Sequence, residues 1–262
     1  MTDGVGIWLY AVTVDGGAAD ELGNVTGVAG EAVRVVVSNS LAAVVGTVPL
    51  EVFGKEPLRR NLEDLTWLEA TARAHDTVVS AVARRGPAVP LRLATVYLDD
   101  DRVRGLLDER RADFESALTL VTDRTEWGVK AYGDRAALTA VVAEAKSTSS
   151  NRGAGTAYLL RRKAQLSAQE TVERDAATRA DEIHEHLVRH AAAGRRQAAT
   201  DPALSGRQDW MVLNGTYLVD DERTDEFVST VGELGKEYPG IRLELTGPWP
   251  PYSFAGVEQE PL

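Results

Sequence analysis

Hydrophobic and polar residues alternate in several short runs along the chain, and this pattern predicts β-strands. Residues 7–14 are almost entirely apolar or β-branched, which indicates a strand buried on both faces. Residues 33–37 and 41–48 flank Ser38-Asn39-Ser40, a sequence typical of a hairpin turn. Near the end of the chain, residues 241–245 alternate apolar with charged side chains, as a half-buried strand does. Further strands are expected at 89–97, 126–133 and 209–219.

Apolar residues spaced three and four apart predict helices. The first helix is expected to begin at Asn61, a good N-cap, and to end at Gly86-Pro87. Its apolar stripe includes His75, so we expect this ring to be buried. Other helices are predicted at 99–121, 135–145, 157–195 and 222–238, with a linker-like stretch at 147–155.

His75 and Arg92 form a candidate buried polar pair. Arg92 alternates into a mostly apolar strand and offers a partner for the histidine ring or a clamp for a carboxylate. We expect the pair to fix the helix on the strand. The simpler alternative is a histidine that is hydrogen-bonded in the core without Arg92.

The order of these elements predicts an α+β protein of two domains. Residues 1–123 form a mixed α/β unit, and residues 124–262 form a ferredoxin-like unit with an antiparallel sheet and a long helix at about 157–195. Gly247 and Pro248 are expected to end the last strand, so that residues 246–262 leave as an extended tail rich in proline and aromatic residues. Because aromatic rings carry large apolar areas, we expect this tail to dock on the fold or on a partner.

Composition excludes several classes of protein. A formal net charge of −11 argues against binding to a phosphate backbone, and no apolar run approaches the roughly 20 residues that span a bilayer. The absence of cysteine excludes disulfides and thiol catalysis. With no basic segment at the N-terminus, the sequence predicts a cytoplasmic protein.

No motif of an enzyme or of a cofactor site occurs, so we expect no catalytic residue, cofactor or metal. His184, His186 and His190 do cluster on one predicted helix, and the last two have the spacing to share a metal. The first points to another side of the helix, so we expect a solvated face instead. Runs of carboxylates lie at predicted helix starts, where capping explains them.

Five segments, in order, resemble the gas vesicle protein F/L family. The most specific is Leu-Thr-Gly-Pro-Trp-Pro-Pro-Tyr-Ser-Phe at the end of the last strand. One segment departs from the family pattern, since Ala94 replaces a glycine, which matters only where φ is positive. The five segments are Trp8–Tyr10, Pro90–Tyr97, Glu126–Tyr132, Ala157–Leu159 and Leu245–Phe254.

The resemblance implies a non-catalytic accessory protein of gas vesicle formation. Such a protein is expected to bind the hydrophobic shell protein and other gas vesicle accessory proteins early in assembly, and some members are minor gas-facing components. Two surfaces are candidates for this contact: the exposed side of the 157–195 helix, and the tail residues Trp249, Pro250, Tyr252 and Phe254.

Two other functions stay open at this point. One is a metal- or small-ligand-dependent enzyme on ferredoxin-like domains, and the other is an oligomeric scaffold with the long helix as its dimer seam. The sequence predicts neither the oligomeric state nor a choice between the F and L roles.

Overall fold

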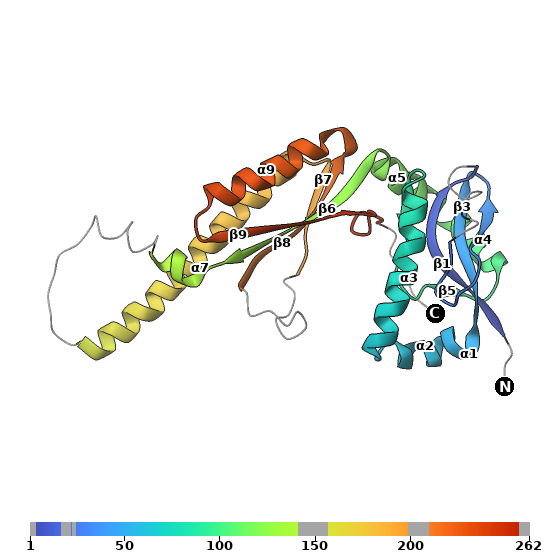
Figure 1. Ribbon diagram of the computed structural model, residues 1–262, viewed down its shortest axis with the longest axis horizontal. Helices are drawn as coiled ribbons and strands as arrows, with labels where there is room; N and C mark the ends of the chain where they lie inside the picture. The colour runs from blue at the N-terminus through green and yellow to red at the C-terminus, as the bar shows by residue number, and fades with distance from the viewer. Residues whose placement is uncertain (1–3, 17–21, 23–24, 141–156, 199–209, 257–262) are drawn as a thin grey trace. The chain divides into compact units, whose positions relative to one another are not determined.

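Two sheets organise the chain, one in each of two compact units. The computed structural model describes residues 4–16, 22, 25–140, 157–198 and 210–256, with only the backbone of residues 157–168. The N-terminal unit comprises residues 1–126 and 248–262, and the C-terminal unit comprises residues 127–247. Both sheets are antiparallel and carry helices, so the protein is of mixed α/β class (Figure 1).

The N-terminal sheet has the strand order β2-β3-β1-β4, and β5 also pairs with β1. Strand β1 is buried from its second residue to its last but one, which confirms the prediction of a strand covered on both faces. The predicted hairpin is also present, with Asn39 at φ 54° in the turn. The strands are β1 (Val5–Val14), β2 (Arg34–Ser38), β3 (Leu41–Pro49), β4 (Ala88–Pro90) and β5 (Val96–Tyr97).

Helices cover both faces of this sheet. On one face, Trp8 and Tyr10 join a core with residues of α1, α2 and α3. On the other face, Ile7 and Leu9 pack with residues of α4 and α5. The helices are α1 (Leu50–Phe53), α2 (Lys55–Asn61), α3 (Leu65–Ala83), α4 (Asp100–Glu109) and α5 (Arg111–Val121).

Two predicted helix boundaries in this unit are wrong. The helix expected from Asn61 begins at Leu65, because the Asp64 carboxylate accepts hydrogen bonds from the backbone N–H groups of Thr66 and Trp67. Asn61 instead ends α2. The single helix expected at 99–121 is divided at Arg110, whose φ of −108° and ψ of 21° are not helical.

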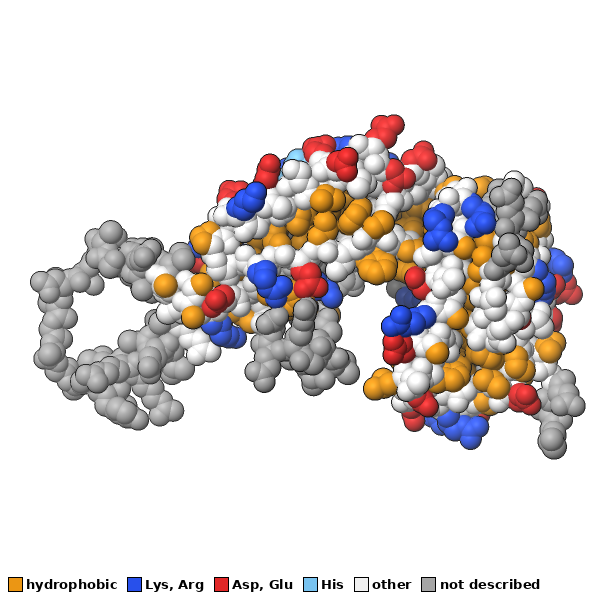
Figure 2. All heavy atoms as spheres, viewed as in Figure 1, with side chains coloured by type: hydrophobic (Ala, Val, Ile, Leu, Met, Phe, Trp, Pro, Cys, Tyr) orange, Lys and Arg blue, Asp and Glu red, His pale blue; other side chains and the backbone are white. Residues whose placement is uncertain are grey.

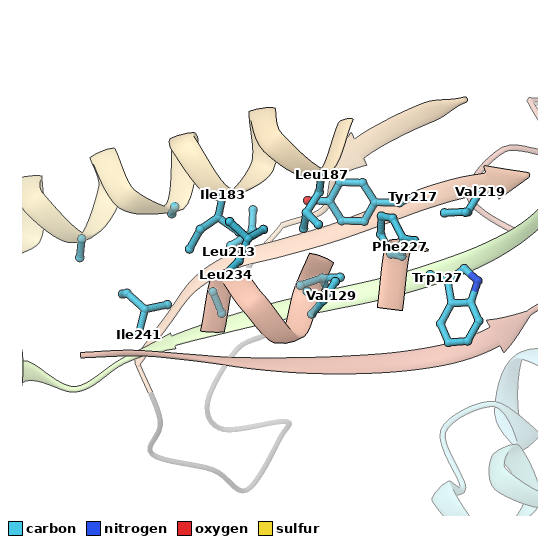
Figure 3. Close-up of a cluster of buried hydrophobic side chains, with 14 of the residues drawn as sticks. Trp127, Val129, Ile183, Leu187, Leu213, Tyr217, Val219, Phe227, Leu234 and Ile241 are labelled. Atoms are coloured by element: carbon cyan, nitrogen blue, oxygen red, sulfur yellow. The ribbon is translucent and has the colours of Figure 1, made fainter. Parts of the chain in front are cut away.

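The C-terminal sheet has the order β7-β8-β6-β9. Helices α7 and α9 lie on one face, where their apolar residues form a single core with the sheet (Figure 3). Residues 135–140 are also helical. The strands are β6 (Arg124–Gly133), β7 (Ala193–Arg196), β8 (Trp210–Asp220) and β9 (Ile241–Trp249), and the helices are α7 (Ala157–Arg189), the 3₁₀ turn η1 (Asp221–Arg223) and α9 (Thr224–Glu237).

The long helix is shorter than predicted. It ends at Arg189 rather than near residue 195, because the chain turns there and the Ala192 N–H donates to the Leu218 carbonyl. Residues 193–196 then pair with β8 as a strand that the sequence pattern did not reveal. The predicted linker at 147–155 and residues 141–145 of a predicted helix lie outside the described residues.

The last strand also differs from prediction. Gly247 and Pro248 do not end it, since β9 continues to Trp249. An edge strand tolerates proline because one side of its backbone needs no ladder hydrogen bond. The residues after Gly247 belong to the N-terminal unit, whereas the sequence assigned the tail to the C-terminal domain. Among the residues described, no helix is both long and apolar enough to cross a membrane.

Candidate partner-binding surface

The tail after β9 folds back in a tight turn. The N–H of Tyr252 donates to the Pro250 carbonyl at 2.8 Å, and the N–H of Phe254 donates to the Pro251 carbonyl at 3.1 Å. Both prolines are buried, and Phe254 is only 1% exposed. The tail therefore docks on its own chain, and it does so as a turn rather than the extended path that its prolines suggest.

A buried carboxylate holds this turn in place. Glu126 is 5% exposed, and its two oxygens accept hydrogen bonds from Ser253, at 2.8 Å from the backbone N–H and at 2.6 Å from the hydroxyl. A buried carboxylate is costly unless such donors satisfy it. No local sequence pattern predicted this pair, although both residues lie within segments that carry the family resemblance.

Two aromatic rings of the tail remain accessible. Trp249 is 49% exposed and Tyr252 is 39% exposed. The Tyr252 hydroxyl donates to Asp76 of α3 at 3.3 Å, and burial together with this carboxylate raises the pKa of Tyr252. Four tail residues were predicted from the sequence as candidates for the partner contact. Of these, Pro250 and Phe254 are buried, and Trp249 and Tyr252 form the candidate surface.

The predicted pair of His75 and Arg92 does not form. His75 is buried as expected, but its Nδ1 accepts from the Trp8 indole N–H at 3.0 Å and its Nε2 lies 3.1 Å from the Leu91 carbonyl. Arg92 is exposed. With both ring nitrogens engaged within the core, burial lowers the pKa of His75 to about 4, so the ring is neutral at pH 7.

Tyr10 is fully buried, and its hydroxyl makes a second set of polar contacts. Its hydroxyl donates to Glu31 at 2.6 Å and accepts from the Val28 N–H at 2.9 Å. The Glu31 carboxylate fits against Gly27 and Gly46, where any Cβ atom would collide with it. Burial, and then the hydrogen bond to Glu31, raise the pKa of Tyr10. Glu31 follows a glycine-rich stretch, residues 15–30, that has no hydrophobic periodicity. The sequence pattern therefore did not predict this contact.

The predicted histidine cluster lies at the end of α7, which contains His184 and His186 and is directly followed by His190. His184 Nδ1 lies 2.8 Å from the Tyr217 hydroxyl, and His190 Nδ1 lies 3.1 Å from Glu226. The rings of His186 and His190 stack with centroids 5.1 Å apart. Within the described part of the chain, no group of three or more potential ligands is placed to hold a metal ion.

Comparison with known proteins decides the family. The model of the family described as "Gas vesicle synthesis protein GvpL/GvpF" matches residues 6–256. The chain belongs to this family. It is 43% identical to gas vesicle protein L of Streptomyces sp. (strain CB03234) over 89% of this chain and 87% of the relative. Gas vesicle protein F of the same strain is 29% identical over 85% and 87% of the two chains.

Solved structures show that the fold is also that of the GvpL/GvpF family. The crystal structure of GvpF from Anabaena sp. PCC7120 superposes with a TM-score of 0.71 at 17% identity, covering 97% of this chain and 98% of that chain. GvpF from Microcystis aeruginosa gives a TM-score of 0.64 at 16% identity, covering 96% and 99%. The resemblance seen in the sequence is therefore confirmed. Two of the segments that carry it meet in space, since Glu126 binds Ser253.

Proposed function

We propose that this protein is a non-catalytic accessory factor of gas vesicle formation that binds the hydrophobic shell protein and other gas vesicle proteins. The match of the GvpL/GvpF family model to residues 6–256 carries this proposal. The factor acts in the cytoplasm on vesicles at an early stage of assembly, and a fraction stays as a minor gas-facing component. The strand order β7-β8-β6-β9, with helices on one face, favours a ferredoxin-like C-terminal domain.

The physical task explains why such a factor is needed. A shell subunit presents an apolar face to gas, and an exposed apolar face promotes aggregation in water. A protein with a net charge of −11 stays soluble while an apolar contact holds the subunit.

Trp249 and Tyr252 are the residues best suited to that contact. Large aromatic side chains dominate the binding energy of many interfaces. These two are attached to a turn that Phe254 anchors in the core and that Ser253 fixes to Glu126. A segment held rigid before binding loses little conformational entropy when a partner docks on it.

Co-purification with the shell protein tests the proposal. The intact chain, co-expressed with the shell subunit, is expected to retain it. The double variant Trp249→Ala/Tyr252→Ala is expected to lose most of it while unfolding at nearly the same temperature. Leu98→Ala is the matched control, because Leu98 is an exposed apolar residue of the same unit, 54% exposed, outside the tail. If the intact chain captures no shell subunit, direct binding is wrong. If the double variant captures as much as the control, the contact lies elsewhere.

An enzyme on the same fold would give a different result. A thermal-shift screen with divalent metals and small ligands is expected to leave the unfolding temperature unchanged. A reproducible shift with one ligand class would favour the enzyme instead.

A further inference from the structure

Leu65 is the most exposed of the large apolar side chains that the structure describes. It is the first residue of α3 and is 79% exposed. The helix does not need leucine at this position, because the Asp64 carboxylate already caps its first turn. Figure 2 shows hydrophobic side chains at the surface around α1, α2 and the beginning of α3. A single exposed leucine is common in soluble proteins, so the residues beside Leu65 decide whether it belongs to a binding surface.

Leu65 begins a strip of apolar residues along one side of α3. Leu68 and Ala72 follow it at helical spacing, and both are half-buried. One turn after Ala72, Asp76 accepts a hydrogen bond from the Tyr252 hydroxyl at 3.3 Å, so the strip reaches the ring of Tyr252 in the tail. Helix α3 and the tail belong to the same compact unit. Together four residues form what we call the α3 strip: Leu65, Leu68, Ala72 and Tyr252.

The charges beside the α3 strip are mostly negative. Residues 63–76 contain four carboxylates and one arginine, which is a net charge of −3 because the buried His75 is neutral at pH 7. Arg73 forms an ion pair with Glu69 at 2.6 Å, so the border of the strip keeps an excess of carboxylates. A partner with an apolar face bordered by lysine or arginine therefore complements both the strip and its border. The four carboxylates are those of Glu63, Asp64, Glu69 and Asp76.

We propose that the α3 strip docks an amphipathic helix of the shell subunit, about three turns long, whose apolar face is bordered by basic residues. This inference rests on the proposed function and extends the contact at Trp249 and Tyr252 along α3. A helix fits the strip because rows of side chains three and four residues apart pack against the matching rows of another helix. Three turns match the rise of about 16 Å between Leu65 and Asp76. The small Ala72 keeps the side-chain volume low in the middle of the strip, where the two helices cross.

Leu65→Glu tests the strip without disturbing the fold. The residue is 79% exposed, and an acidic side chain in the first turn of a helix is favoured by the helix dipole, so the unfolding temperature is expected to stay the same. On co-expression, the variant is expected to retain at most about a tenth of the shell subunit that the unmodified chain retains, because a charge then faces an apolar surface. Leu98→Glu is the matched control at another exposed leucine of the same unit, and it is expected to retain the full amount.

Charge reversal tests the basic border of the partner helix. Glu69→Lys is expected to lower the amount of retained shell subunit about threefold at low salt, and less at high salt. Asp101→Lys is the matched control. It changes the net charge equally and also breaks an exposed ion pair to an arginine, but it lies on α4, which covers the other face of the sheet. Equal retention by Glu69→Lys and this control would overturn the basic border.

Photo-crosslinking identifies the occupant of the strip. p-Benzoylphenylalanine in place of Leu65 is expected to cross-link the shell subunit within a helix that has lysine or arginine beside its apolar face. In place of Leu98 it is expected to give no such product. Cross-links from position 65 to a non-helical segment, or to another gas vesicle protein alone, would overturn the assignment of the occupant.

Failure of the docking and failure of the proposed function give different results. If the unmodified chain captures no shell subunit, the proposed function is wrong and the docking is wrong with it. If the unmodified chain captures the subunit and Leu65→Glu retains as much as Leu98→Glu, only the docking on α3 is overturned.

Discussion

The carboxylate of Glu126 accepts two hydrogen bonds from Ser253, a residue 127 positions further along the chain, and so fastens the C-terminal turn to the N-terminal unit. Glu126 is the last residue of the first stretch of the N-terminal unit, and Ser253 lies in its second stretch, which begins at Pro248. These two hydrogen bonds therefore attach a segment from the end of the sequence to the N-terminal unit. The exposed rings of Trp249 and Tyr252 are presented on this fastened turn.

Ser253→Ala is expected to lower the free energy of unfolding by about 1–3 kcal/mol, because a buried carboxylate loses its hydroxyl donor. Denaturant titration measures this change. Ser229→Ala, at an exposed position of α9, is the control and is expected to change stability by less than about 0.5 kcal/mol. If Ser253→Ala costs no more than this control, the hydroxyl does not hold the turn.

His75 makes stability depend on pH. Its pKa is about 4 in the folded chain and about 6.5 when unfolded, so the unfolded state binds the proton first as the pH falls. Stability is full above pH 6.5 and is expected to decrease by about 3 kcal/mol as the pH falls to 4. His75→Gln, which cannot take up the proton, should flatten this part of the stability curve. An identical slope in the variant would assign the pH dependence to other groups.

Truncation of Phe254 is expected to destabilise the protein much more than truncation of Trp249. Phe254→Ala empties a buried site and should lower the free energy of unfolding by about 3–5 kcal/mol. Trp249→Ala removes a ring that is 49% exposed and should cost much less. The same denaturant titration compares the two variants. A larger loss from Trp249→Ala would mean that Trp249, not Phe254, anchors the tail.

Ala94 adopts φ 69°, a left-handed conformation that alanine takes at a cost. The family pattern has glycine at this position, and the structure now shows a reason for it. Ala94→Gly is expected to stabilise the protein by about 0.5–1 kcal/mol, as relief of strain exceeds the added entropy of the unfolded chain. Ala136→Gly, on a helical turn, should instead destabilise by about 1 kcal/mol. A destabilising Ala94→Gly would show that the methyl group contributes more by packing than it costs in strain.

Periodicity predicted those elements whose burial follows local sequence. Strand β1, the 38–40 hairpin and the buried position of His75 are examples, because one face or both faces of each element meet a core. Contacts between distant residues decided the rest. The four residues of β7 have no alternation of their own and are held by pairing with β8, and His75 bonds Trp8 because the fold brings β1 beneath α3. The aromatic content of the tail predicted the candidate surface. The sequence did not show which rings are exposed, because packing in the fold decides that Phe254 is buried and Trp249 is exposed.

Gas vesicle production in cells is the most direct measurement of the central claim. Cells that make every other gas vesicle protein but lack this chain are complemented with the unmodified protein, with Trp249→Ala/Tyr252→Ala, or with the control Leu98→Ala, and vesicles are counted by electron microscopy. We expect vesicles with the unmodified protein and with the control, and few or none with the double variant at equal protein level. Abundant vesicles in cells without the chain would contradict a required role in assembly.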